Sequence, residues 1–264
     1  MKNNNLFLIG SLAILVFSAC NKADYLDVNA GDRPPLSASI RFVNARIPAT
    51  GIQFWTFTQK VTTDAVLPGA ASPYVPTTFG NVQINFTEGS GTSYKASRQF
   101  GNSATYSATG GPNGPIAGYH HTVFAASAKY NTGKDTLILF YDDLSAPPSG
   151  KAKLRFVHLA QGIGGVNVKL KQNNAESALF SAIPYGSAGG SNLQGTAYES
   201  APFTNVNAGT ISLIVSAGEN ATPVTIEQQG LTNITLEAGK IYTVFIRADS
   251  KGGVSAGILS TGGL

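Results

Sequence analysis

The feature that most constrains this chain is an internal repeat. Residues Ala38–Phe57 (ASIRFVNARIPATGIQFWTF) align without a gap with Ala152–Lys171 (AKLRFVHLAQGIGGVNVKLK). The tripeptide Arg41–Val43 is identical to Arg155–Val157, and apolar residues alternate with polar ones in the same phase in both stretches. A period of two is the pattern of a half-buried β-strand. The repeat therefore predicts two copies of a domain that opens on a strand.

Two further blocks recur in the same order. Tyr74–Val82 and Tyr198–Val206 share a Tyr, a Phe five residues later and an Asn-Val pair, and Ala117–Phe124 resembles Ala238–Phe245. Three blocks in one order favour a tandem duplication over coincidence. Each copy should contain about seven short strands, and this number suits an antiparallel β-sandwich. The predicted fold class is all-β, with two tandem antiparallel β-sandwich domains.

The composition agrees with strands and turns. Charged residues make up 12% of the chain, and glycine accounts for 30 of the 264 residues. Long amphipathic helices need Glu, Lys, Leu and Ala in quantity, and no window supplies them. In the second copy we expect strands at 152–158, 166–170, 178–183, 210–216, 223–227, 231–236, 241–247 and 254–259. In the first we expect strands at 38–43, 52–57, 82–86 and 136–141, a loop at 68–76, and one or two short strands within the loop-rich segment 88–115.

The first residues are typical of an export signal. Lys2 precedes the apolar run Leu6–Phe17, which is too short to span a membrane stably. The run is followed by Ser18, Ala19 and Cys20, the single cysteine of the chain. This arrangement resembles a bacterial lipoprotein signal, which implies that Cys20 carries a lipid and becomes the first mature residue. An ordinary signal peptide with a chance cysteine is the alternative.

The predicted organisation follows from these patterns and from the position of the prolines. It comprises a signal peptide (1–19), a flexible tether (20–36), a first sandwich (37–145), a linker (146–150) and a second sandwich (151–264). The net charge of +4 comes from 18 basic and 14 acidic residues. The longest basic cluster, Lys151–Arg155, merely alternates along one face of a strand, so nucleic acid is not an expected partner. The expected location is the bacterial cell envelope, most simply the outer membrane, on its periplasmic or surface face.

A family resemblance rests on three motifs of the second copy. Leu154–His158, Val166–Val168 and Ala238–Phe245 together resemble the DUF4397 domain family. The resemblance extends over 37–145 and 151–262 and is clearer in the second of these segments. It implies an Ig-like sandwich of a kind found, often in tandem, in exported bacterial proteins. Because the function of that family is undefined, the resemblance implies no functional residues.

Few residues suit catalysis or metal binding. His120 and His121 are neighbours on a predicted strand and should point to opposite faces, and His158 stands alone, so neither a metal nor another cofactor is expected. No Gly-x-Ser-x-Gly motif lies on a predicted strand–turn–helix, the setting in which its serine serves as a hydrolase nucleophile. Asp142 and Asp143 form the single acidic doublet, which we interpret as a solvated strand end rather than a calcium site. The sequence therefore predicts no enzyme, and a hydrolase with an unrecognised site is a distant alternative.

The candidate binding residues are aromatic. If Ile52 and Phe54 face the core, Trp55 and Phe57 lie on the opposite face, where an exposed pair could stack on a sugar or dock a protein. Packing against the other domain is the alternative for Trp55. We expect a non-enzymatic envelope lipoprotein with a binding or structural role, whose partner is an envelope protein or a glycan. A glycan-binding surface lipoprotein is the sharper alternative, and its site would combine Trp55 and Phe57 with a tyrosine from a loop.

Two expectations concern single segments. Asp135-Thr136-Leu137 resembles a short acceptor for O-glycosylation, but an ordinary strand start is the favoured interpretation. On the first strand of each copy, Phe42 and Phe156 should lie in the sandwich core. Arg41 and Arg155, which alternate with them, should face solvent.

Overall fold

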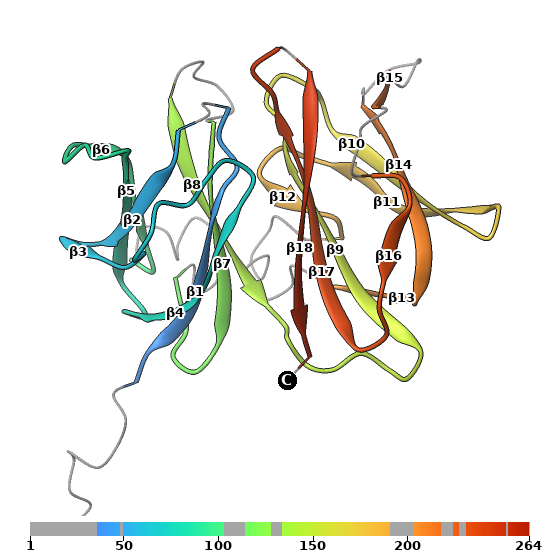
Figure 1. Ribbon diagram of the computed structural model, residues 1–264, viewed down its shortest axis with the longest axis horizontal. Helices are drawn as coiled ribbons and strands as arrows, with labels where there is room; N and C mark the ends of the chain where they lie inside the picture. Colours follow the sequence, from blue (N-terminus) through green and yellow to red (C-terminus); the bar gives the residue numbers. More distant parts are fainter. Residues whose placement is uncertain are drawn as a thin grey trace, which may run out of the picture. The chain divides into compact units, whose positions relative to one another are not determined.

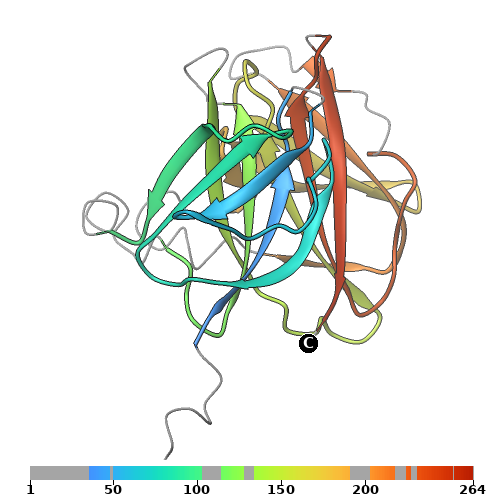
Figure 2. The ribbon, with the colours of Figure 1, turned by 60° about the vertical axis from the view of Figure 1, so that its left-hand side comes forward.

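The computed structural model describes residues 36–47, 50–102, 114–127, 134–190, 203–217, 224–226, 231–251 and 253–263. Within these residues every regular element is a strand (Figures 1 and 2). The first half of the chain holds β1 (Ala38–Asn44), β2 (Ile52–Thr56), β3 (Gln59–Lys60), β4 (Ala71–Thr77), β5 (Val82–Glu88), β6 (Tyr94–Phe100), β7 (His120–Ser127) and β8 (Asp135–Asp142). The second half holds β9 (Lys151–Leu159), β10 (Val166–Gln172), β11 (Ala175–Ile183), β12 (Ser187–Ala188), β13 (Thr204–Asn207), β14 (Gly209–Ala217), β15 (Val224–Ile226), β16 (Ile234–Leu236), β17 (Lys240–Ala248) and β18 (Val254–Gly262).

The two halves repeat one strand order. In the first half, β4-β1-β7-β8 form an inner sheet and β3-β2-β5-β6 an outer sheet. In the second half, β12-β9-β17-β18 form the inner sheet, with β13 also on β9, and β11-β10-β14-β15 the outer sheet, with β16 also on β14. All pairs are antiparallel except β1 with β7 and β9 with β17. The all-β sandwich class is therefore confirmed, and each half adds one parallel pair to the predicted antiparallel pattern.

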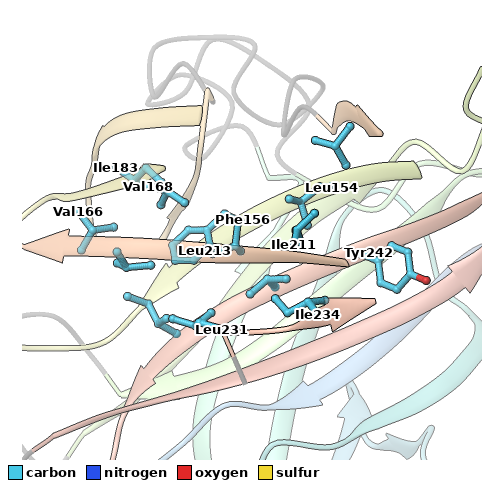
Figure 3. Close-up of a cluster of buried hydrophobic side chains, with 14 of the residues drawn as sticks. Leu154, Phe156, Val166, Val168, Ile183, Ile211, Leu213, Leu231, Ile234 and Tyr242 are labelled. Atoms are coloured by element: carbon cyan, nitrogen blue, oxygen red, sulfur yellow. The ribbon is translucent and has the colours of Figure 1, made fainter. Parts of the chain in front are cut away.

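Each sandwich encloses its own apolar core. In the first half, Phe42 of β1 packs on Phe54 of β2 with ring centroids 4.7 Å apart, and both side chains are fully buried. In the second half, the core includes Phe156, Leu154 and Val168 (Figure 3). The predicted inward positions of Phe42 and Phe156 are confirmed.

A third apolar cluster lies between the β4-β1-β7-β8 sheet and the β12-β9-β17-β18 sheet. We call these two sheets inner because they face each other across this cluster. Phe124 of β7 and Phe245 of β17 meet there edge-on, with ring centroids 5.4 Å apart. Gly257 of β18 leaves room for this contact, because a Cβ at that position would overlap the ring of Phe245. The remaining buried members are Val43, Ala45, Ala126, Phe140, Val157, Leu159, Ala188 and Leu259. Residues Leu36–Leu264 accordingly form one compact unit.

This interface overturns the expectation that the two arginines face solvent. Arg155 is 0% exposed and Arg41 is 7% exposed. Arg155 Nη2 lies 2.6 Å from Asp142 Oδ1 of the first half, and the guanidinium stacks on the ring of Phe203 at 4.4 Å. The strand phase is right, since both arginines point away from their sandwich cores. The exposure is wrong, because the first half covers Arg155, while Tyr74 of β4 and Thr122 of β7 contact Arg41 within its own half.

Two further expectations fail for local reasons. The segment predicted as a loop at 68–76 contains most of β4, which among the described strands pairs only with β1. Pro73 and Pro76 are tolerated there because an edge strand leaves one side of its backbone unpaired. The repeat block at Tyr74–Val82 is also misaligned: Thr77 pairs with Ala38 as Val206 pairs with Ala152, so Thr77 rather than Val82 is the counterpart of Val206.

Candidate binding surface

Trp55 lies on the outward face of the first outer sheet. Along β2, Ile52 and Phe54 are fully buried in the core, while Trp55 points the other way and is partly exposed. Its cross-strand neighbours are Asn85 of β5 and Lys60 of β3. The indole Nε1 donates a hydrogen bond to Thr87 Oγ1 at 3.2 Å. The ring is therefore held in one orientation on a face that is free of the sandwich core.

Phe57 and Tyr94 complete an aromatic group around this ring. Phe57 follows β2 and is 43% exposed, and Tyr94 begins β6 and is 42% exposed. The Trp55 and Tyr94 rings meet edge-on with centroids 6.2 Å apart, and the Tyr94 hydroxyl donates to the Phe57 carbonyl oxygen at 3.0 Å. The sequence named Trp55, Phe57 and an unspecified tyrosine, and the structure brings all three together with Tyr94. We call these three residues the aromatic surface.

Phe57 occupies an unusual backbone position. Its φ is +51°, in the left-handed region that bulky L-residues rarely adopt. It lies in the two-residue turn that joins Thr56 to Gln59 in the β2–β3 hairpin. The corresponding β10–β11 hairpin places Asn173 and Asn174 at φ +51° and +62°, and asparagine tolerates that region much better. The first half thus keeps an exposed aromatic side chain where a turn-forming residue would fit with less strain.

A buried amide lies at the same site. Asn85 is 0% exposed although it lies on the outward face, and its Nδ2 donates to the Phe57 carbonyl oxygen at 2.8 Å. The Asn85 Oδ1 atom has no hydrogen-bond partner among the described residues. A buried acceptor without a donor costs about 1–3 kcal/mol. The carbonyl of Phe57 therefore receives two hydrogen bonds, while the amide oxygen beside it receives none.

The rest of this face is polar and mostly uncharged. Gln83 Nε2 donates to Ser97 Oγ at 2.6 Å, across the β5–β6 ladder. The exposed Lys60 brings one positive charge beside Trp55, and Lys95 at the sheet edge lies 3.7 Å from Glu88. Amide and hydroxyl groups thus provide most of the hydrogen-bonding capacity around the aromatic surface.

The histidines do not converge on a metal. His121 and His158 are fully buried in different halves, and His120 is partly exposed on the face opposite His121. Burial lowers the pKa of His121 to about 4, although the nearby Asp142 charge opposes this shift. The His158 ring accepts from Ala160 N and contacts Gly164 O at 3.1 Å. Among the described residues no group of three or more His, Cys, Asp or Glu side chains could hold a metal ion.

The acidic doublet is not a solvated strand end. Asp142 is 2% exposed, and in addition to Arg155 it accepts hydrogen bonds from Thr122 Oγ1 at 2.5 Å and Tyr74 OH at 2.8 Å. Burial alone would raise the pKa of Asp142, but the positive charges of Arg155 and Arg41 and these hydrogen bonds hold it below its ordinary value. The two aspartates therefore have different environments: Asp142 lies in the interface between the halves, and Asp143 faces outward.

The outward member, Asp143, fixes the linker. Lys153 Nζ lies 2.7 Å from both Asp143 Oδ2 and Ser145 Oγ. A serine beside a lysine can act as a nucleophile only if the lysine amine is free to accept a proton. Here the carboxylate pairs with the ammonium group, and both contacts to Lys153 use it as a donor. The arrangement ties the end of the first half to β9.

Two predicted modification sites, Cys20 and Thr136, stay predictions. Cys20 lies outside the described residues. Thr136 is partly exposed at the start of β8, and the carboxylate of Asp135 before it lies 2.8 Å from Arg46 Nε. Glycosylation of Thr136 therefore stays a prediction. No helix among the described residues is long and apolar enough to cross a membrane.

The chain matches the model of a family described as "Domain of unknown function (DUF4397)" over residues 38–169. Because the match covers half of the chain, the protein belongs to the DUF4397 family. The match starts with β1 and ends within β10, so it covers the first half and the opening of the second. The motifs had suggested a clearer resemblance in the second half.

Two solved structures show a weak likeness to this chain. A candidate cell adhesion protein from Bacteroides uniformis ATCC 8492 is 10% identical, with 86% of this chain and 98% of that chain covered and a TM-score of 0.22. Another from Bacteroides eggerthii DSM 20697 is 9% identical, with 87% and 97% covered and a TM-score of 0.21. Likenesses this low carry no argument about what this protein binds. No curated protein matches the chain.

Proposed function

We propose that this protein is a non-enzymatic lipoprotein of the bacterial cell envelope that binds a partner molecule through the aromatic surface. The observation that carries the proposal is the grouping of Trp55, Phe57 and Tyr94 on one outward face. Binding sites favour tryptophan and tyrosine, because these side chains offer a large contact area for little loss of conformational entropy. Hydrogen bonds from the Trp55 indole and the Tyr94 hydroxyl already hold two of the three rings in place.

The strained turn supports binding over a spacer role. Strain persists where function requires a particular side chain, and Phe57 in the left-handed region is such a case. The large apolar side chains that are exposed also fall mostly in the first half; of the described side chains in the second half, only Ile258 joins them. The second half would then act as the spacer or support of the first, with each half a domain of its own (37–145 and 151–264).

The anchor forms the second part of the proposal. Cys20 would carry the lipid and the segment up to residue 36 would tether the first sandwich to the outer membrane, on either face. One acyl chain gives only reversible membrane binding, whereas the several chains of a lipoprotein anchor firmly. Cys20→Ser should abolish membrane association and incorporation of radiolabelled fatty acid, while circular dichroism still shows a β-rich chain. Equal labelling of the Cys20→Ser protein would contradict the anchor.

The binding function is tested on isolated bacterial envelopes. The full chain, purified from membranes in detergent, is compared with Trp55→Ala, Phe57→Asn and Lys169→Ala. Lys169 aligns with Trp55 in the second half and is exposed, so it is a matched control. We expect Trp55→Ala and Phe57→Asn to bind envelopes at least about tenfold more weakly, while Lys169→Ala binds normally. Equal binding by all four proteins would overturn the proposal.

A further inference from the structure

We infer that the aromatic surface takes an uncharged carbohydrate, with a sugar ring stacked on Trp55 and Tyr94 and its hydroxyls hydrogen-bonded to the surrounding amides. This inference rests on the proposed function and names its ligand class. Sugar rings present apolar C–H faces and a rim of hydroxyl donors and acceptors. They therefore need apolar ring faces bordered by neutral polar groups, and such a site uses a few well-placed polar atoms for orientation.

The two rings are arranged to receive such a ligand. Because Trp55 and Tyr94 meet edge-on, at an interplanar angle of 62°, they do not cover each other's faces as parallel stacked rings would. Each ring is fixed through its polar atom, Trp55 by Thr87 and Tyr94 by the Phe57 carbonyl. A ligand that stacks here loses little affinity to the ordering of side chains.

The polar anchor of the site is Asn85. Its Oδ1 is buried and lacks a donor among the described residues, while its Nδ2 is already bonded to the Phe57 carbonyl. A ligand hydroxyl could donate to Oδ1 once the exposed side chain of Phe57 turns toward the ligand, while Trp55 and Tyr94 keep their positions. This contact would remove an unpaired buried acceptor and so favour a ligand rich in hydroxyl donors.

The charge of the face selects against other occupants. Acidic polysaccharides need clustered basic groups, whereas Lys60 is the charged neighbour of Trp55 and Lys95 is near Glu88. A stable protein partner covers about 800 Å² per side around an apolar centre. The aromatic surface has three rings, and its border is formed by the polar residues Gln83, Asn85 and Ser97 rather than by further apolar side chains. The match of an uncharged, hydrogen-bonding face to an uncharged, hydroxyl-rich ligand favours the carbohydrate.

The test uses affinity electrophoresis of the full chain in detergent, in gels that contain neutral polysaccharides (an α-glucan, a β-glucan, a mannan, a xylan) or acidic ones (polygalacturonate, heparin). Trp55 is the single tryptophan of the sequence, so its fluorescence reports on this site without a label. We expect at least one neutral polysaccharide to retard the chain and to change its fluorescence. Trp55→Ala and Phe57→Asn should each weaken the retardation at least about tenfold, while Lys169→Ala leaves it unchanged.

Phe57→Asn keeps the test decisive if Trp55→Ala folds poorly, because asparagine suits the turn. Retardation by acidic gels alone, lost in Lys60→Ala, would overturn the inference, since charge would then drive binding. A chain that no neutral gel retards, but whose envelope binding still falls in Phe57→Asn, would overturn the carbohydrate and leave the proposed binding function standing. If envelope binding is also unaffected, both proposals fail.

Discussion

The two halves of this protein share a scaffold but differ in what they place on it. On both inner sheets an arginine contacts a threonine and an aromatic ring: Arg41 bonds Thr122 at 3.2 Å and lies over Tyr74, and Arg155 bonds Thr243. The carboxylate is different. Asp142 of β8 has Thr261 of β18 at its corresponding position, so the first half supplies an acid and the second half supplies the arginine that binds it.

The outer sheets differ in the side chains that they expose. The first presents the aromatic surface, whereas the second presents Lys169, which lies 3.9 Å from Glu176, both exposed. An exposed ion pair of this kind contributes about 0–1 kcal/mol and binds nothing by itself. The inner faces of the two halves are thus alike and joined, whereas the outer faces differ, and it is the outer face of the first half that carries the proposed binding surface.

The largest effect should come from separating the halves. Residues 151–264 expressed alone would keep the core of Figure 3 but expose Val157, Leu159, Phe245 and Leu259. Each such side chain loses about 1.5–3 kcal/mol of burial, so we expect a β-rich chain that self-associates. Analytical ultracentrifugation measures this. A monomer as stable as the full chain would mean that the interface contributes little.

The buried ion pair provides the next comparison. Arg155→Ala leaves Asp142 buried without its strongest partner and should cost about 3–5 kcal/mol of the free energy of unfolding. Arg41→Ala removes one hydrogen bond and a ring contact, and should cost about 1–2 kcal/mol. Urea unfolding of the full chain measures both. Equal losses would show that the two arginines still play the same part.

Truncating a core phenylalanine should cost the two halves the same free energy of unfolding, unlike the unequal losses expected for the two arginines. Phe42→Ala and Phe156→Ala each remove a fully buried ring and leave a cavity, at a cost of about 3–5 kcal/mol. Denaturant unfolding, read by circular dichroism, compares them. A much smaller loss for one of the two would mean that its core can collapse around the cavity.

Acid should weaken the first half first. His121, whose counterpart in the second half is Tyr242, has its pKa lowered by burial to about 4. The unfolded chain binds a proton at this residue below about pH 6.5 and the folded chain only below about 4. Stability therefore falls as the pH drops from about 6.5 to 4, by about 3 kcal/mol from this residue.

Asp142 adds to this loss at lower pH. Because its pKa is held below the ordinary value of 3.8, its contribution is present above that value and is lost as the pH falls through the folded pKa. Unfolding free energies measured from pH 7 to 3 test both steps. His121→Gln should remove the step between pH 6.5 and 4 and leave the lower one. A profile unchanged by that substitution would contradict the assignment.

The smallest expected effects on stability come from the turns of the β2–β3 and β10–β11 hairpins. Phe57→Asn should stabilise the chain by about 0.5–1 kcal/mol, because asparagine relieves the left-handed turn. Asn173→Ala should destabilise it by a similar amount. Thermal unfolding measures both. If Phe57→Asn lowers the melting temperature, Phe57 is there for packing and its strain says nothing about binding.

The sequence predicted the elements and their phase better than their surroundings. Alternation placed Phe42, Phe156 and Trp55 on the correct faces, because that pattern depends on the strand alone. It could not show that the reverse face of β9 is covered, since the covering residues belong to β7 and β8. For the same reason Arg155 and Asp142 were assigned to solvent.

Tyr94 escaped a specific prediction for a different reason. The ladder between β5 and β6 shifts register between Phe86 and Thr87, and this irregularity brings Tyr94 opposite Thr87, beside Trp55. A bulge of this kind has no reliable signal in a single sequence. The sequence therefore predicted two of the three aromatic residues, Trp55 and Phe57, by position. It did not predict the buried amide of Asn85 at the same site.

The most direct test of the account moves the tryptophan. In the double variant Trp55→Phe, Lys169→Trp the single tryptophan occupies the corresponding position of the second half. Both proteins are titrated with the neutral polysaccharide that most retards the full chain, and tryptophan fluorescence is recorded. We expect Trp55 to respond with a saturable change and the tryptophan at 169 to stay silent. A response at position 169, or a silent Trp55 while the polysaccharide still binds, would contradict the claim that recognition belongs to the first half.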